Sequence, residues 1–178
     1  MSESAINMLN TVLSFFTLLG HIGIGGFLIA WWLKEDRVLS IVRRHGLFLS
    51  FGVALAATFL SLIYSNIIGY EPCILCWYQR IFMYPLVVLF GIALWKKDTT
   101  VVRYALPLAV LGGLIGLFQY YGQFFNASAL DVCGAGPSCA QLFFVGFGYI
   151  TIPLMSLTSF VLIILFMMVL KRGSSERP

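Results

Sequence analysis

Charged residues are scarce in this chain of 178 residues, where 11 Lys and Arg and 7 Asp and Glu make up only 10%. An ordinary soluble domain carries about a quarter, so the shortage excludes that class. It also excludes nucleic acid as a partner, because so few basic side chains cannot follow a phosphate backbone. Disorder is excluded as well, since 60% of the residues are hydrophobic and must be buried in a core or in lipid.

Alternation of apolar and polar residues is also missing, which excludes the strands of a transmembrane β-barrel. Long hydrophobic runs are present instead. A helix that crosses about 30 Å of hydrocarbon needs about 20 mostly apolar residues. Five stretches are long enough: Met8 to Leu33, Leu47 to Ile68, Cys73 to Trp95, Tyr104 to Phe124 and Tyr149 to Leu170. The sequence therefore predicts an all-α fold, a polytopic membrane protein with five transmembrane helices.

The first stretch lacks the marks of a cleaved signal peptide. No Lys or Arg precedes it, no A-x-A-like cleavage site follows it, and its apolar run is longer than that of a signal peptide. We therefore expect it to remain as a helix. An odd number of spans then places the two termini on opposite sides of the membrane.

Ten of the eleven basic residues lie in three segments that five spans place on one side of the membrane. They are Lys34, Arg37, Arg43 and Arg44, then Lys96, Lys97 and Arg103, and finally Lys171, Arg172 and Arg177. The positive-inside rule identifies this side as the cytoplasm. We expect a cytoplasmic C-terminus, an extracytoplasmic N-terminus and extracytoplasmic cysteine loops.

All four cysteines lie in the two outer connections, as the pairs Cys73 with Cys76 and Cys133 with Cys139. Disulfides persist outside the cytoplasm, so an even number of cysteines there indicates two disulfides. Such bridges can be purely structural. A bridge that spans five or fewer intervening residues removes little chain entropy, however, which favours redox-active pairs over structural ones.

The C-x-x-C pair of Cys73 and Cys76 follows Pro72. Proline is favoured at a first helical position, so the third helix is expected to begin at Pro72 with both sulfurs in its first turn. Free backbone N–H groups and the helix dipole stabilise a thiolate there, which is the usual setting of a reactive pair. Zinc sites also use this spacing, but zinc would require the second pair as thiolate ligands in an oxidising compartment. No metal is expected.

Arg80 is the one basic residue outside the cytoplasmic segments, four positions after Cys76 and on the same helix face. An ionisable residue at that depth is costly and indicates a functional site; the alternative is an anchor that reaches the membrane surface. We expect Arg80 to stabilise negative charge on the Cys76 thiolate and on an oxygen of an apolar electron acceptor. A quinone fits, because no haem or flavin motif is present.

The second pair differs in kind. Gly-Ala-Gly-Pro-Ser separates Cys133 from Cys139, and neither cysteine has a cation nearby. A disulfide there is expected to be accessible and relatively oxidising, and suited to attack by another protein's thiolate. Two cysteine pairs on one side suggest a relay in which a partner reduces the loop pair, and the loop pair then exchanges with the C-x-x-C. The aromatic segment 141–147 is expected to lie in the membrane interface.

Three motifs resemble the DsbB family of disulfide-bond formation proteins, and within it the short Gram-positive type called BdbC. They are the run Glu-Pro-Cys-Ile-Leu-Cys-Trp-Tyr-Gln-Arg-Ile-Phe-Met-Tyr-Pro-Leu (71 to 86), the five-residue spacing of Cys133 and Cys139, and Phe-Gly-Tyr-Ile-Thr-Ile-Pro (147 to 153). The resemblance covers roughly Leu47 to Lys171. The vitamin K epoxide reductase-like family does related chemistry, but there the loop pair precedes the C-x-x-C.

The resemblance implies a four-helix bundle in the cytoplasmic membrane of a prokaryote. Such a protein reoxidises a thioredoxin-fold thiol oxidase of the DsbA or BdbD type and passes two electrons to ubiquinone or menaquinone. It further implies the disulfides Cys73/Cys76 and Cys133/Cys139. By position, Cys76 matches the sulfur that engages the quinone and Arg80 the quinone-binding arginine. Cys133 matches the cysteine that forms the mixed disulfide with the partner.

The chain departs from the family core at its N-terminus. Residues 1–45 would form an additional transmembrane helix and its cytoplasmic connection, residues 46–172 the four-helix core, and residues 173–178 a cytoplasmic tail. Within the additional helix, Gly20 to Gly26 is glycine-rich and is expected to be a small-residue packing face against the bundle. His21 in this segment is expected to be an interface residue with satisfied hydrogen bonds rather than a proton relay.

A second departure concerns proton transfer. Family members often carry a histidine before the cysteine loop, where this chain has Gln119 and Gln123. Either amide is a candidate donor to a quinone carbonyl, but Gln cannot exchange protons at neutral pH as His does. Two competing functions stay open: a conduit that carries reductant outward across the membrane, and a non-catalytic membrane subunit with structural disulfides.

Overall fold

The computed structural model describes the backbone of residues 2–133 and 138–175 and the side chains of residues 2–130 and 138–172. It contains the helices α1 (Glu3–Trp32), α2 (Asp36–Leu62), α3 (Ile74–Lys96), α4 (Val102–Phe124) and α5 (Ile152–Ser175). A short π-helix η1 (Ile63–Ile68) extends α2, and a 3₁₀ helix η2 (Ala127–Cys133) follows α4. Each of the five long helices is apolar enough to cross a membrane, and the described part of the chain contains no strand. The predicted all-α membrane fold is confirmed.

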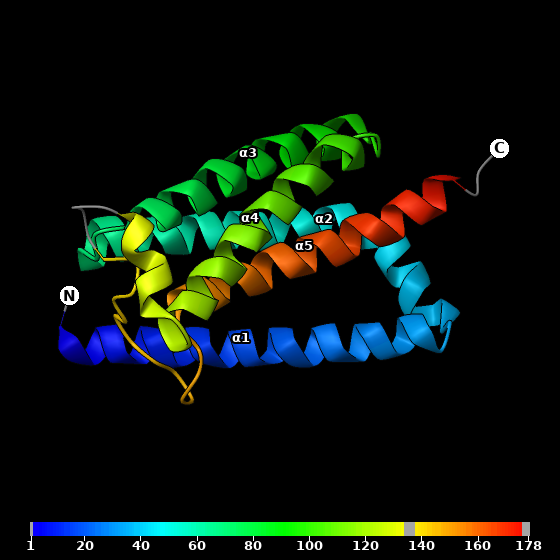
Figure 1. Cartoon of the computed structure of the whole chain (residues 1–178). Coiled ribbons are helices and arrows are strands. Elements are labelled where there is room, and N and C mark those ends of the chain that lie inside the picture. Colours follow the sequence, from blue (N-terminus) through cyan, green and yellow to red (C-terminus); the bar gives the residue numbers. More distant parts are fainter. Residues whose placement is uncertain (1, 134–137, 176–178) are drawn as a thin grey trace.

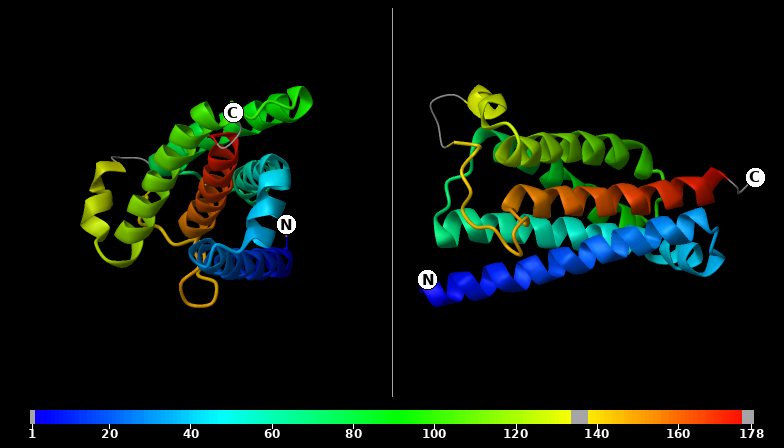
Figure 2. Two further views of the ribbon diagram at one scale, coloured as in Figure 1. Left: turned by 90° about the vertical axis from the view of Figure 1, so that its right-hand side faces the viewer. Right: turned by 60° about the horizontal axis from the view of Figure 1, so that its bottom comes forward.

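Helices α2 to α5 form a bundle in which each packs against the next along the chain and α5 returns to α2. Helix α1 lies outside this bundle, against α5 and less extensively against α2 (Figure 1). Figure 2 shows the same bundle from one end, with α1 at its edge. The N-terminus and the connection from α4 to α5 lie at one end, and the C-terminus lies at the other (Figure 1). The molecule therefore has a cysteine end and an opposite end that carries the basic connections.

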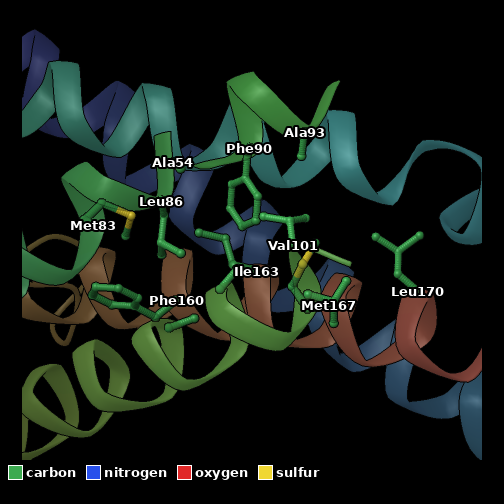
Figure 3. Packing of buried hydrophobic residues seen from close by; sticks show 13 residues of the cluster. Ala54, Met83, Leu86, Phe90, Ala93, Val101, Phe160, Ile163, Met167 and Leu170 are labelled. Carbon is green, nitrogen blue, oxygen red and sulfur yellow. The ribbon is translucent and has the colours of Figure 1, made fainter. Parts of the chain in front are cut away.

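The apolar core of the bundle lies toward the basic end. Its buried side chains come from all four bundle helices and pack together between them (Figure 3); they include Ala54, Met83, Leu86, Phe90, Val102, Phe160, Ile163 and Met167. Gly112 lets α4 approach α5 closely, because a Cβ at this position would overlap the ring of Phe160. This half of the bundle is a close-packed base. The polar buried groups of α3 and α4 lie nearer the cysteine end.

Helix α2 begins at Asp36, well before the predicted Leu47. The carboxylate of Asp36 lies in the first turn, where it interacts favourably with the helix dipole. The backbone N–H of Leu39 bonds to the carbonyl of Glu35, which closes that turn. Arg37, Arg43 and Arg44 therefore lie on an exposed helical extension, whereas Lys34 lies in the turn before it.

Helix α5 begins at Ile152 rather than at the predicted Tyr149. Phe147 and Gly148 have left-handed backbone angles, with φ of 48° and 81°. They form a tight turn before the helix. The backbone N–H and carbonyl of Ile150 then bond to the carbonyl and N–H of Gly146, which keeps residues 149–151 outside the helix.

The expected start of the third helix at Pro72 is wrong, because α3 begins at Ile74. Cys73 is the N-cap residue with an extended backbone (φ −68°, ψ 170°), and its carbonyl accepts the first helical hydrogen bond, from the N–H of Trp77. Cys76 is therefore the third helical residue. Both cysteines still lie within the first turn and its cap.

The glycine-rich segment of α1 packs only at Gly20, where a Cβ would lie 3.1 Å from Cγ2 of Thr158. Nothing lies within 4 Å of a Cβ placed at Gly23, Gly25 or Gly26, so the expected small-residue packing face is wrong beyond Gly20. Gly23 and Gly26 are exposed, and the contact of this part of α1 with α2 and α5 is made by the large buried ring of Phe27 instead.

Candidate active site

Cys73 and Cys76 lie at the N-terminus of α3 with their Sγ atoms 3.3 Å apart. Both are free thiols in this structure. Cys73 is 4% exposed, whereas Cys76 is half-buried. The Cys73 thiol donates a hydrogen bond to the Cys76 sulfur at this distance, and once Cys73 has lost its proton the Cys76 thiol can donate in return. The structure therefore brings the predicted C-x-x-C pair together at a helix terminus, shielded from bulk water.

The hydrogen bond from the Cys76 thiol lowers the pKa of Cys73, which precedes the membrane-spanning part of α3, to about 6. Burial acts in the opposite direction, whereas the backbone N–H groups of Cys76 and Leu75 and the amide of Gln119 add to the lowering. The pair therefore releases its first proton below the usual pKa of a thiol. The first negative charge rests on Cys73, with Cys76 as its hydrogen-bond donor, whereas the sequence led us to expect the thiolate on Cys76.

Gln119 of α4 lies between this pair and the cysteine loop. Its Nε2 is 3.3 Å from the Cys73 sulfur, 3.5 Å from the Cys76 sulfur and 3.5 Å from the carbonyl oxygen of Cys139. Its Oε1 accepts a hydrogen bond of 2.7 Å from Nε2 of Gln79. This bond orients the amide so that its N–H groups face the sulfurs. At 2% exposure, Gln119 links the two cysteine segments from inside the protein.

The loop cysteine Cys139 is disulfide-bonded and only 1% exposed. It belongs to the same buried cluster as Cys73, together with Leu75 and Leu130. The expectation of an accessible loop bridge is therefore wrong for this sulfur, because packing against the α3 terminus covers it. The side chain of Cys133 lies outside the described residues, so the pairing Cys133/Cys139 stays a prediction.

Gln123 contributes to the placement of the loop. Its Nε2 donates to the carbonyl oxygen of Cys139 at 3.2 Å and to that of Gln141 at 3.3 Å. Gln123 thus holds the loop backbone one turn beyond Gln119. Neither glutamine lines the cavity described below, so the expected contact between either amide and a quinone carbonyl is not supported.

Arg80 points from α3 toward α2. Its Nε donates to Oγ of Ser61 at 2.8 Å and its Nη2 to the carbonyl oxygen of Ser61 at 3.0 Å. The guanidinium also lies 5.2 Å from the ring centroid of Trp77. A surface anchor would keep its charge in water, whereas Arg80 is 9% exposed. Its two hydrogen-bonding partners in α2 are neutral, so the cation retains its capacity to stabilise an added negative charge.

Cys76 and Arg80 both line one cavity of about 130 Å³. The cavity lies between α2, α3 and α5, and Leu13 of α1 completes its wall. Most of the lining residues are apolar. An apolar cavity of about 150 Å³ binds benzene in another protein, so this one has room for a single ring of an apolar molecule. The arrangement places a reactive sulfur and a buried cation against such a ring.

Several residues at this cavity were not predicted from the sequence as site residues. Tyr84 lines it, and its hydroxyl is buried with no hydrogen-bond partner among the described residues. The spacing from Cys76 to Arg80 to Tyr84, four positions each time, is a signal that could have found it. Phe143, from the segment expected to lie in the interface, lines the cavity too.

His21 of α1 lies away from the cavity and is satisfied at both ring nitrogens. One nitrogen lies 3.3 Å from the Tyr149 hydroxyl and the other 3.0 Å from Oγ1 of Thr158. The imidazole also stacks on the Tyr149 ring, with centroids 5.9 Å apart. The expectation of a satisfied interface residue agrees with these contacts.

The model of the family described as disulfide bond formation protein DsbB matches residues 43–170. The chain belongs to the DsbB family. Disulfide bond formation protein C of Bacillus subtilis is 45% identical over 131 residues, which are 73% of this chain and 95% of that protein. "Probable disulfide formation protein C 2" of Bacillus anthracis is 37% identical over 78% of this chain and 100% of its own length. "Probable disulfide formation protein" of Chlamydia pneumoniae is 37% identical over 76% and 98%.

Membership in the DsbB family makes the chain a multi-pass membrane protein with a disulfide-forming oxidoreductase role. The match includes the cysteine pair, Arg80 and the glutamines of α4. It begins within α2, so helix α1 lies outside it. No solved structure matches the chain.

Proposed function

We propose that this DsbB-family protein is a thiol:quinone oxidoreductase that reoxidises an extracytoplasmic thiol oxidase and passes the electrons to a membrane quinone. The observation that carries the proposal is the cavity that Cys76 and Arg80 share. A quinone head carries one quinoid ring, which stands alone in ubiquinone and is fused to a second ring in menaquinone, and its carbonyl oxygens become negative on reduction. The cavity offers apolar walls for the ring, a sulfur as electron donor and a cation for the oxygen.

The reaction is balanced without a further reactant. Two thiols lose two electrons and two protons when they form a disulfide, and a quinone takes up the same number to become a hydroquinone. The quinone, ubiquinone or menaquinone, is the second substrate. Cys76 faces it, and Cys73 closes the disulfide with Cys76 as the electrons leave. Arg80 stabilises the negative charge that develops on the acceptor oxygen, and the free hydroxyl of Tyr84 is the second candidate hydrogen-bond donor.

On the thiol side, we propose that a thiolate of the partner attacks Cys133 and breaks its bond to Cys139. The partner's second thiol then releases the mixed disulfide, which leaves the loop pair reduced. The disulfide Cys73/Cys76 reoxidises the loop pair. The burial of Cys139 beside Cys73 supports this exchange, because the two sulfurs belong to one cluster. A thioredoxin-fold oxidase of the DsbA or BdbD type is the proposed partner.

The proposed orientation places the cysteine end outside the cytoplasm and the C-terminus inside. The separation of cysteines and basic connections to opposite ends of the bundle supports it. The proposed division of the chain is an additional helix with its connection in residues 1–45, a catalytic four-helix core in 46–172 and a tail in 173–178. The family match over residues 43–170 supports this core.

The test uses purified full-length protein in detergent with a reduced thioredoxin-fold dithiol oxidase and either decylubiquinone or menadione. Loss of the quinone absorbance should follow the protein concentration, with a protein-free reaction as the control for direct chemical oxidation. Cys76→Ser should abolish this turnover. Undiminished turnover of Cys76→Ser would exclude the assignment.

The two competing functions make different predictions in cells. A reductant conduit keeps the four cysteines reduced whether or not quinone is present, because its electrons come from the cytoplasm. A non-catalytic subunit keeps its disulfides whether or not quinone is present. The proposed enzyme accumulates reduced cysteines only when quinone is lacking. Thiol alkylation in cells with and without quinone therefore separates all three functions.

A further inference from the structure

We propose that α1 forms one wall of the quinone cavity and that Asn10 positions Tyr64 within that wall; this inference rests on the proposed function. Helix α1 precedes the family match, which begins at residue 43. The Bacillus anthracis relative is covered in full by 140 residues of this chain, which leaves the rest of the chain without a counterpart there. The contacts of α1 nevertheless reach the catalytic half of the bundle.

One face of α1 is polar and turned toward the bundle. Its residues follow one another at spacings of four, three and four positions: Asn10, Ser14, Thr17 and His21. Asn10 is 8% and Ser14 1% exposed, whereas Phe15 on the outer face is half exposed. Lipid offers no hydrogen-bond partner, so inward-facing polar groups in a membrane helix indicate specific contacts.

One of these contacts is a buried hydrogen bond that joins α1 to the cavity wall. The hydroxyl of Tyr64 donates to Oδ1 of Asn10 at 2.7 Å, and both side chains are buried. Tyr64 lies in the π-helix η1 and lines the cavity. Leu13, one turn after Asn10 in α1, lines the same cavity. A π-helical segment inside a helix frequently marks a functional site. Here it turns the Tyr64 ring toward the cavity and its hydroxyl toward α1.

Tyr64 is part of a group of stacked rings, which we call the aromatic wall: Tyr64, Tyr70, Phe143 and Phe144. The ring of Tyr64 stacks on Tyr70 with centroids 5.9 Å apart and on Phe144 at 6.2 Å. Tyr70 stacks on Phe143 at 4.4 Å. Tyr64, Tyr70 and Phe143 line the cavity together with Cys76 and Arg80. The hydrogen bond to Asn10 therefore fixes one member of a wall that faces the reacting groups.

Other contacts fix the position of α1 along the bundle. Gly146 packs against Ser14 so closely that a Cβ on this glycine would overlap the Ser14 side chain. Two turns farther on, Gly20 packs against Thr158, and His21 lies within hydrogen-bond distance of the Thr158 hydroxyl. These contacts set the register that places Asn10 opposite Tyr64. The additional helix thus prepares the cavity in its binding shape before the quinone enters.

The experiment measures the quinone KM of three variants in the decylubiquinone assay. Asn10→Leu removes the acceptor at similar volume, Tyr64→Phe removes the donor, and the third variant carries both changes. Asn7→Leu is the matched control, because Asn7 is exposed one turn earlier on the same helix. Each single change should raise the KM about threefold to tenfold, because this factor corresponds to the free energy that one buried hydrogen bond contributes. The exchange rate between the partner and the loop disulfide should be unchanged.

The double variant distinguishes positioning from general damage. Because both changes remove the same bond, its KM should be no higher than that of the more affected single variant. The proposal would be overturned if both single variants had the KM of the control. It would also be overturned if the increases in KM from the two single changes added up in the double variant. Should Asn10→Leu fail to accumulate, Tyr64→Phe alone still decides it. Failure of the proposed function itself looks different, since it appears as undiminished quinone reduction by Cys76→Ser.

Discussion

The side chain of Arg80 donates two hydrogen bonds to a single residue, with Nε 2.8 Å from Oγ of Ser61 and Nη2 3.0 Å from its carbonyl oxygen. Both acceptors are neutral. A cation buried in the membrane region usually faces an anion or a water-filled space. Since Arg80 borders the cavity that Cys76 also lines, the arrangement fixes the guanidinium in place and leaves its charge to a ligand.

Replacement of Arg80 by Gln should therefore weaken quinone binding and leave thiol exchange intact. Loss of a hydrogen bond to a charged group corresponds to about 1.5–3 kcal/mol, so the quinone KM should rise about 10-fold to 150-fold. Arg103→Gln is the matched control, because Arg103 is exposed at the opposite end of the bundle. A KM near the wild-type value in Arg80→Gln would reduce Arg80 to an anchor of α3.

The lowered pKa of Cys73 predicts how the reduced pair titrates. A lowered pKa means that the thiolate is present above about pH 6 and is lost as the pH falls through that value. Thiolate ultraviolet absorbance should therefore show a midpoint near pH 6 in reduced protein with Cys133→Ser and Cys139→Ser, which isolates the pair. Adding Cys76→Ala removes the principal cause of the shift and should move the midpoint upward. A midpoint near pH 9 before that addition would contradict the hydrogen bond between the sulfurs.

Gln119 provides a prediction that separates the thiol side from the quinone side. Gln119→Leu removes the amide that faces both sulfurs and leaves Gln79 without its acceptor. Electron transfer from the loop pair to Cys73/Cys76 should slow, and the protein should lose about 1–3 kcal/mol of stability. The quinone KM should not change, because Gln119 does not line the cavity.

The control for this change is Gln141→Leu, since the Gln141 side chain is exposed and only its carbonyl accepts a bond from Gln123. Stopped-flow measurement of loop reoxidation and the steady-state quinone KM give the two readouts. A raised quinone KM in Gln119→Leu, with loop reoxidation at the wild-type rate, would instead support the role expected from the sequence, in which the Gln119 amide donates to a quinone carbonyl.

The sequence was sufficient for those features that depend on local spacing. Five apolar stretches predicted five spans, and the four-residue step from Cys76 to Arg80 predicted that both would face one site. The partners of these residues come from distant segments. Ser61 reaches Arg80 from the last turn of α2, next to a π-helix that no local pattern announces. Gln119 turns to the sulfurs rather than to the cavity because Gln79 orients its amide.

The packing of the first helix also depends on distant segments, and local spacing therefore did not predict it. A glycine-rich segment predicted close packing, but Gly23 and Gly26 are exposed and the large ring of Phe27 makes the contact there. The decisive contact instead joins Asn10 to Tyr64, 54 positions later in the chain. Asn10 is a polar residue near the beginning of an apolar run, and no sequence pattern marks it. Only the fold shows that it meets a tyrosine at the cavity.

Replacement of Tyr84 separates the stability of the protein from its binding of quinone. Its hydroxyl is buried beside the cavity without a hydrogen-bond partner among the described residues. A buried hydroxyl without a partner is unfavourable for folding, so Tyr84→Phe should leave the melting temperature unchanged or raise it. If the hydroxyl donates to the quinone, the same change should raise the quinone KM about twofold to tenfold. Loss of stability together with an unchanged KM would show that the hydroxyl serves the fold instead.

Tyr104→Phe is the matched control, because Tyr104 is exposed on α4 near the basic end of the bundle. It should change neither the melting temperature nor the KM. Thermal unfolding in detergent and quinone titration of the same preparations provide both measurements. A higher melting temperature together with a higher quinone KM in Tyr84→Phe, but not in Tyr104→Phe, would identify a polar group held ready for the acceptor. A residue needed only for packing would not improve folding and weaken quinone binding through the loss of one oxygen atom.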